Sequence, residues 1–326
     1  MKWIRWMIVF EVVLIVLLGP LVLCDPEHRS AAQARVDAPG RLIRLSAGVT
    51  HFELSEPAAR ALNENLPSDP APLVVLVPGL ATPYFVWDPT REALLAAGYP
   101  VLRYDLYGRG YSDRPEGAVH DVNLYDRQLL ELLDALGVSR PVHIVGLSMG
   151  GVISIHFADR HPKRVRSLSL FAPAGFPMEI PFIARFARLP GIGDYFIHAF
   201  GHGQFMSRLG RNMYDQSLLS EYKKEFLPQM KVAGTKAALL SSLRRMPLGE
   251  SRPVYERVAT RDESDRIPMQ VLWGVEDRVI PFSVGEAMRA ALPDVPFHAV
   301  ENAGHLLHWE RPEAVRSKLM KFLKDH

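Results

Sequence analysis

Short apolar runs alternate with segments of helical periodicity along most of the chain. The runs Leu73–Val77, Val101–Tyr104, Val142–Val145 and Val165–Phe171 are mostly apolar, and three of them are rich in β-branched residues. Runs of this length and composition are typical of strands that are buried on both faces of a parallel sheet. We therefore predict four consecutive central strands.

Three helical segments separate these runs, and each ends at a glycine or just before a proline. They are Asp88–Ala97, Asn123–Leu136 and Gly150–Arg160. Glycine after a helix and proline beyond it are common stop signals. Strands that alternate with helices predict an α/β fold, with a mostly parallel sheet and helices on both faces.

The regular alternation is interrupted once, between about residues 172 and 266, where an aromatic-rich helical pattern follows the sixth strand. Leu42–Leu54 has the looser alternation of an edge hairpin, and strands resume at Met269–Trp273 and Phe297–Val300 before a last helix, Pro312–Lys324. An insertion at this point predicts a helical cap over the carboxyl edge of the sheet, where ligands bind in open α/β sheets. We expect one catalytic domain, residues 41–326, that includes this cap.

The first 24 residues contain an apolar run, Met7–Leu23, with basic residues before it and acidic residues after it. This pattern predicts an N-terminal hydrophobic helix that anchors the chain in a membrane, with the catalytic domain on the non-cytoplasmic side. Ala32 and Ala34 resemble a signal-peptidase site, so a secreted or periplasmic protein after signal cleavage is the alternative. Residues 25–40 are small and polar, and they are predicted to be a linker.

Composition narrows the choice of function. The chain has 326 residues and a formal net charge of only +2, which gives no electrostatic reason to expect a nucleic-acid partner. Its single cysteine, Cys24, excludes an internal disulfide framework and a cysteine-rich zinc site. No motif indicates a metal or an organic cofactor.

The strongest motif is G-x-S-x-G at residues 146–150, between the strand Val142–Val145 and a helix. A serine at a sharp strand-to-helix turn projects its hydroxyl into the site, and the tight turn requires small residues at Gly146 and Gly150. Ser148 is thus the candidate nucleophile. The dipole of the following helix favours negative charge that develops beside it.

A serine nucleophile needs a histidine base, and the base needs a carboxylate that fixes its tautomer. Asp277 follows the strand Met269–Trp273, and His305 follows Phe297–Val300, so both are expected at the same edge as Ser148. The order serine, aspartate, histidine is that of the α/β hydrolases rather than of chymotrypsin or subtilisin. The rival candidates are His308 for the base, and Glu276 and Asp294 for the acid.

Two backbone N–H groups are expected to bind the oxyanion of a tetrahedral intermediate. Met149, directly after the nucleophile, supplies one, and Leu80, after Pro78-Gly79 at the end of the strand Leu73–Val77, supplies the other. The glycines that flank Arg109 suggest a phosphate-binding loop, but the full glycine spacing of such a loop is missing.

From about Leu73 to the C-terminus the chain resembles the α/β-hydrolase family. The matching segments are Asp105–Ser112, Gly146–Gly151, Trp273–Pro281 and Ala303–His305. The resemblance is to the serine branch that holds monoacylglycerol lipases, carboxylesterases and carbon-carbon bond hydrolases of aromatic ring cleavage. It implies an α/β-hydrolase fold, a helical cap and the triad Ser148, Asp277 and His305. One departure is Pro78, where the family more often has histidine.

The resemblance leaves the substrate open between two chemistries. Apolar cap residues, with Phe182, Phe196 and Phe200 as the predicted substrate-binding residues, favour carboxylic esters or lipids with apolar acyl chains. The alternative is a carbon-carbon hydrolase of ring-cleavage diketones, for whose carboxylate the cap offers Arg185 and Arg208 among its basic residues. A non-catalytic ligand-binding protein of the same fold is the minor alternative.

Overall fold

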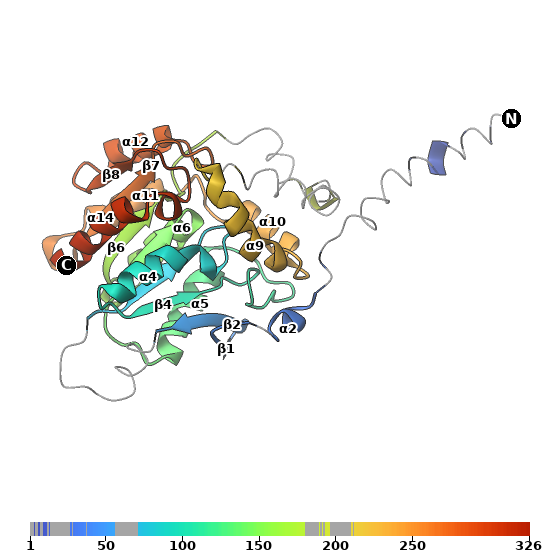
Figure 1. Ribbon diagram of the computed structural model, residues 1–326, viewed down its shortest axis with the longest axis horizontal. Helices are drawn as coiled ribbons and strands as arrows, with labels where there is room; N and C mark the ends of the chain where they lie inside the picture. The colour runs from blue at the N-terminus through green and yellow to red at the C-terminus, as the bar shows by residue number, and fades with distance from the viewer. Residues whose placement is uncertain are drawn as a thin grey trace.

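The chain folds around a single twisted sheet (Figure 1). The computed structural model describes residues 27, 29–36, 38–55, 71–179, 189, 191, 193–195, 210 and 212–326, with positions 3, 6, 9–11 and 13 of the N-terminus. Within these residues, eight strands pair in the order β1-β2-β4-β3-β5-β6-β7-β8. The predicted α/β architecture with a mostly parallel sheet is confirmed.

Only the first two strands run against the others. β1 (Arg41–Leu45) and β2 (Gly48–Leu54) form the predicted edge hairpin, and β2 pairs antiparallel with β4. The remaining pairs are parallel. These strands are β3 (Val74–Val77), β4 (Val101–Tyr104), β5 (Val142–Leu147), β6 (Val165–Phe171), β7 (Met269–Gly274) and β8 (Phe297–Val300).

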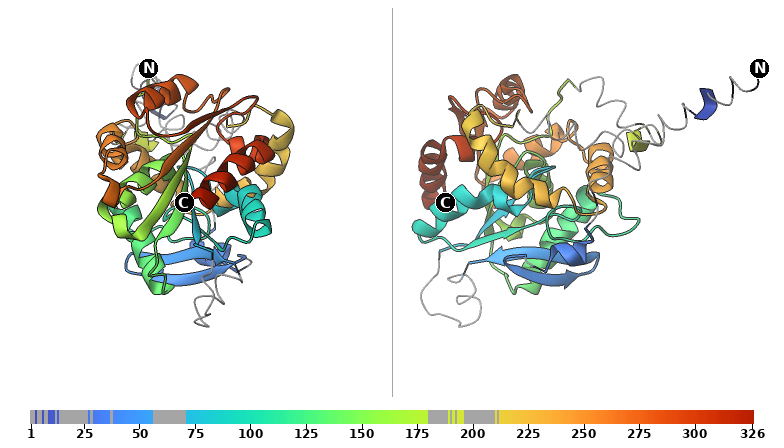
Figure 2. Two further views of the ribbon diagram at one scale, coloured as in Figure 1. Left: turned by 90° about the vertical axis from the view of Figure 1, so that its left-hand side faces the viewer. Right: turned by 45° about the vertical axis from the view of Figure 1, so that its right-hand side comes forward.

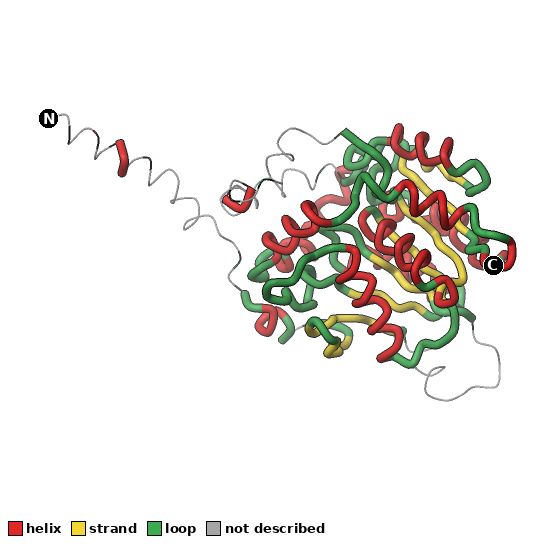
Figure 3. The backbone as a smooth tube through the Cα atoms, turned by 180° about the vertical axis from the view of Figure 1, so that it is seen from behind, coloured by secondary structure: helices red, strands yellow, loops and turns green. Residues whose placement is uncertain are grey.

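Helices cover both faces of the sheet (Figures 2 and 3). α4 (Asp88–Ala96) and α14 (Pro312–Asp325) pack together on one face, and α5 (Val122–Ala135), α6 (Met149–Arg160) and α11 (Arg252–Ala259) lie on the other. α12 (Phe282–Ala291) packs against β7, and the short α13 (Leu307–Glu310) precedes α14. This double covering explains why every residue of β3, β4, β5 and β7 is buried.

The predicted insertion lies between β6 and β7, which are adjacent and pair directly in the sheet. Its described part includes α9 (Leu219–Gln229), α10 (Thr235–Arg245) and α11. Tyr222 of α9 packs on Phe85, with ring centroids 5.2 Å apart, and Ser242 of α10 accepts a hydrogen bond of 2.8 Å from Arg109. α9 and α10 therefore lie over the loops that follow β3 and β4.

The segment predicted as a linker, residues 25–40, makes defined contacts with the domain. It contains the one-turn helix α2 (Ala31–Ala34), which Ser30 caps, and Arg35 forms an ion pair of 2.6 Å with Asp113. The Glu27 carboxylate accepts hydrogen bonds from the N–H groups of Gly234 (2.9 Å) and Lys236 (2.6 Å) at the start of α10. This segment thus joins the insertion to the sheet domain.

The prediction of a membrane-anchored protein is wrong. Across the part of the chain that the structure describes, no helix has both the length and the apolar character that crossing a membrane demands. A span needs about 20 predominantly apolar residues, whereas Met7–Leu23 is shorter and is interrupted by Glu11 and Pro20. Most of residues 1–24 lie outside the described residues. The predicted hydrophobic helix, the membrane partner and the placement on the non-cytoplasmic side are accordingly withdrawn.

Candidate active site

Ser148 occupies a strained turn between β5 and α6. Its φ of 55° and ψ of −118° lie in a region that residues other than glycine rarely adopt. The flanking glycines make the turn possible: a Cβ at Gly146 would lie 2.5 Å from Ser154 Oγ, and one at Gly150 would overlap the carbonyl oxygen of Val77. These residues therefore form a sharp strand-to-helix turn, the geometry that the sequence predicts for a nucleophile.

Backbone hydrogen bonds hold this strained conformation in place. The Ser148 N–H donates to the carbonyl of Phe171 (2.9 Å), and the Ser148 carbonyl accepts from Gly151 (2.9 Å) and Ala174 (3.0 Å). β5 before it and Met149 after it are buried, whereas Ser148 itself is partly exposed. The serine is thus the accessible residue in an otherwise buried junction.

His305 and Asp277 form a buried pair. Nδ1 of His305 lies 2.7 Å from Oδ2 of Asp277, and the side chains are 6% and 0% exposed. The other carboxylate oxygen accepts hydrogen bonds from Val279 N (2.7 Å) and Ile280 N (2.9 Å). Since an ionised carboxylate only accepts hydrogen bonds, Nδ1 carries the proton, and Nε2 is the ring nitrogen that remains for a substrate-side partner.

The loops that carry the pair are fastened to each other. Glu276 N donates to Ala303 O (3.0 Å), and Ala303 N donates back to the Glu276 carboxylate (2.9 Å). A Cβ at Gly274 would overlap the carbonyl oxygens of Ala303 and Gly304. The close approach of these loops, which glycine permits, brings Asp277 and His305 within hydrogen-bond distance.

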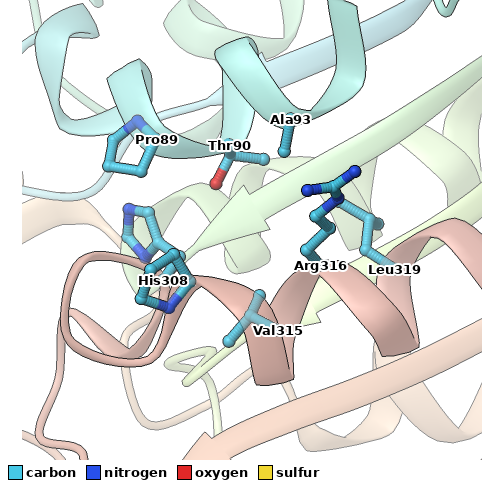
Figure 4. Close-up of a pocket in the computed structure, with 8 residues that line it drawn as sticks. Pro89, Thr90, Ala93, His308, Val315, Arg316 and Leu319 are labelled. Atoms are coloured by element: carbon cyan, nitrogen blue, oxygen red, sulfur yellow. The ribbon is translucent and has the colours of Figure 1, made fainter. Parts of the chain in front are cut away.

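The rival candidates have other partners. His308 is 1% exposed, and its Nε2 donates a hydrogen bond to Val86 O (2.8 Å). Figure 4 shows the ring beside Pro89 and Thr90 of α4. Burial lowers the pKa of His308 to about 3, so this ring is neutral at ordinary pH. Glu276 is engaged with Ala303, and Asp294 is exposed. The structure pairs neither rival acid with a histidine.

The two predicted oxyanion donors flank the serine. Met149 is the first residue of α6, so its N–H has no carbonyl partner within the helix. Leu80 follows Gly79, where a Cβ would lie 3.4 Å from Ser148 Cβ, and Gly79 N donates to Thr82 Oγ1 (2.7 Å). The loop after β3 thus lies directly beside the serine, as an oxyanion loop must.

Arg109 is a supporting residue whose role the sequence did not reveal. Its buried guanidinium donates to Leu80 O (2.8 Å), to Tyr125 OH (2.6 Å) and to Ser242 Oγ (2.8 Å). Burial lowers its pKa. The side chain connects the loop after β3 with α5 and α10. The sequence placed Arg109 in the segment Asp105–Ser112, which resembles the α/β-hydrolase family, but assigned it no role.

Other predicted elements of the site lie outside the described residues. These are the substrate-binding candidates Phe182, Phe196 and Phe200, together with Arg185 and Arg208 of the alternative chemistry. Among the residues that the structure describes, no group of three or more His, Cys, Asp or Glu side chains is arranged to hold a metal ion.

The fold and the site agree with one family. Residues 74–318 match the alpha/beta hydrolase family, so the chain belongs to this family and is a hydrolase. A 2-hydroxy-6-oxononadienedioate/2-hydroxy-6-oxononatrienedioate hydrolase of Cupriavidus pinatubonensis is 30% identical over 248 residues, which cover 74% of this chain and 82% of the relative.

Further relatives carry other activities in their names. An uncharacterized carboxylesterase, nap, of Bacillus subtilis is 28% identical over 258 residues, which cover 77% of this chain and 79% of the relative. The crystal structure of the enol-lactonase from Burkholderia xenovorans is similar with a TM-score of 0.68 at 22% identity, and the match covers 87% of this chain and 100% of that chain. This structural likeness bears on the fold alone.

Proposed function

We propose that this protein is a carboxylesterase that cleaves esters of apolar acyl groups through an acyl-enzyme on Ser148. The observation that carries the proposal is the buried contact of 2.7 Å between His305 and Asp277, at the same sheet edge as a serine in a strained turn. A histidine base held by a carboxylate, together with a partly exposed serine, is the arrangement that acyl transfer requires.

Each residue has a role in this reaction. His305 Nε2 removes the proton of Ser148 Oγ as that oxygen attacks the ester carbonyl, and Asp277 stabilises the resulting imidazolium. The N–H groups of Leu80 and Met149 bind the oxyanion. The imidazolium then protonates the leaving alcohol, and a water molecule, activated by the same ring, releases the acid from Ser148.

The second candidate is hydrolysis of a carbon-carbon bond, which the name of the Cupriavidus relative supports. The name denotes a dioate, so such a substrate brings carboxylates that need cationic partners. The buried guanidinium beside the oxyanion loop, Arg109, already donates to Leu80, Tyr125 and Ser242. The cap candidates for such a partner, Arg185 and Arg208, lie outside the described residues. We favour esters because the predicted apolar cap residues suit acyl chains and because an ester needs no cationic partner.

A substrate series tests the proposal. Burial of one methylene contributes about 0.8 kcal/mol, close to a fourfold gain per carbon if the contact is fully made in the transition state. On the same reasoning, we expect kcat/KM to rise from acetyl to roughly hexanoyl or octanoyl p-nitrophenyl esters. Phe196→Ala or Phe200→Ala should shift the preferred acyl-chain length while activity on acetyl esters remains. If no ester is cleaved and a ring-fission diketone is, the carbon-carbon hydrolase is the better account.

A further inference from the structure

Glu310 is a buried carboxylate close to the predicted base. It ends the short helix α13, five residues after His305, and is 4% exposed. Its Oε1 accepts a hydrogen bond from Gly304 N (2.8 Å), and its Oε2 accepts from Tyr214 N (2.6 Å) and Asp215 N (2.7 Å). One side chain therefore holds three backbone donors from two distant parts of the chain.

These two parts are the histidine loop and the insertion. Residues 212–215 belong to the insertion and lead into α9, whereas Gly304 directly precedes His305. On the other side of the histidine, Leu306 N donates to Asn212 O at 3.0 Å. A Cβ at Gly304 would lie 2.9 Å from Tyr214 N, so the two backbones are in close contact. Leu306 is thus bonded directly to the insertion, and Gly304 is bonded to it through the Glu310 carboxylate.

The chemistry of the three bonds requires a carboxylate. Burial raises the pKa of Glu310, while the N–H groups of Asp215, Gly304 and Tyr214 and the charge of Arg311 act in the opposite direction. Hydrogen bonds from N–H groups to an ionised acceptor are about twice as strong as those between neutral groups. A glutamine offers one acceptor oxygen and turns an NH₂ group toward the remaining donors, so it leaves buried N–H groups unpaired.

We propose that Glu310 is a positioning residue that fixes His305 against Asp277 by tying the histidine loop to the insertion. The carboxylate binds the backbone of the histidine loop and takes no part in the reaction itself. It affects catalysis only through the position of His305. The inference rests on the proposed function only in that His305 is taken as the base. Placement of the base thereby depends on the insertion being seated on the sheet domain.

A double-mutant cycle tests this role. We expect Glu310→Gln to lower kcat by about tenfold or more with little change in KM, because even a 1 Å misplacement of a catalytic group costs up to about a hundredfold. In the His305→Ala background the same substitution should cause no further loss, since there is no base left to position. Glu313→Gln, at an exposed site on the neighbouring helix, is the matched control and should leave kcat unchanged.

Two outcomes overturn the inference. If Glu310→Gln lowers the residual activity of His305→Ala by the same factor as that of the wild type, its role is structural only. If Glu310→Gln fails to fold, Glu310→Asp takes its place, because it keeps the charge with a side chain that is shorter by one methylene. Full kcat in Glu310→Asp would contradict the positioning role. A His305→Ala enzyme with full activity would instead reject the proposed base, which separates the two failures.

Discussion

Ser148, the proposed nucleophile, has a backbone conformation that residues with a side chain disfavour. Its positive φ costs of order 1–3 kcal/mol, which the surrounding structure must supply. The bonds to Phe171, Gly151 and Ala174 hold the backbone in that state. This conformation places Ser148 directly before the first turn of α6, where the helix dipole favours negative charge.

Substitutions of Ser148 separate chemistry from strain. Ser148→Ala should abolish ester turnover and labelling by a fluorophosphonate probe, with little loss of stability, because no packing is removed. Ser148→Gly should also be inactive but more stable than Ser148→Ala by about 1 kcal/mol, since glycine adopts the positive φ without strain. Chemical denaturation measures the difference. Labelling of either variant would show that the nucleophile is another residue.

Gly274 has no side chain, and this allows the loops of Asp277 and His305, the predicted acid and base, to approach each other. A Cβ there would overlap the carbonyl oxygens of Ala303 and Gly304 and push the histidine loop away from Asp277. We expect Gly274→Ala to destabilise the fold by about 1–3 kcal/mol, the usual cost of overpacking, and to reduce kcat. Gly249→Ala is the control, because a Cβ at that position would meet nothing nearer than 3.7 Å. Equal kcat in both variants would refute the argument.

At the scale of elements, the insertion is held at several separate points. Glu310 binds residues 214 and 215, Arg109 reaches Ser242, and Glu27 caps the start of α10. Each contact joins the insertion to a different loop of the sheet domain or to the N-terminal segment. The position of α9 and α10 over the loops after β3 and β4 is therefore set by polar bonds as well as by apolar packing.

The N-terminal segment should stabilise the domain. A chain that begins at residue 38 loses the Glu27 cap and the Arg35–Asp113 ion pair, whereas one that begins at residue 27 keeps both. A lost helix cap costs about 1 kcal/mol and a partly exposed ion pair less, so we expect a difference of about 1–2 kcal/mol. Urea denaturation of the two chains measures it. Equal midpoints would mean that the segment only rests on the surface.

The whole molecule buries several histidines in neutral form, which makes its stability depend on pH. Burial lowers the pKa of His308 and that of His120 to about 3 each, and that of His143 to about 4. In the unfolded chain these rings titrate near 6.5. Between the two values the unfolded state binds more protons than the folded state, so the stabilising contribution is full above about pH 6.5 and is lost as pH falls.

His308 provides the test of this dependence. As the pH falls from roughly 6.5 toward the pKa of the folded protein, each such ring should lower the free energy of unfolding by about 1.4 kcal/mol per pH unit. His308→Phe removes one titrating group, so the slope of unfolding free energy against pH should become shallower by that amount. Denaturation at several pH values from 4 to 7 gives the slope. An unchanged slope would mean that His308 is already protonated in the folded protein.

The sequence by itself determined the class of fold and the order of the elements. Apolar runs and helix-stop residues are local signals, and strands such as Val101–Tyr104 and Val165–Phe171 lie where the pattern predicted them. The candidates Ser148, Asp277 and His305 followed from their positions at strand ends. The predicted membrane anchor failed because an apolar run does not distinguish a spanning helix from a shorter segment.

Only the tertiary structure decided which side chains meet. The pairing of His305 rather than His308 with Asp277 depends on the contact between the loops after β7 and β8, which are far apart in sequence. Two of the three donors to Glu310, Tyr214 N and Asp215 N, are 96 and 95 positions away, and only Gly304 N is near in sequence. No local pattern encodes the two distant bonds. Local sequence fixes backbone conformation, whereas bonds between distant segments form only when the sheet brings its strand ends to one edge.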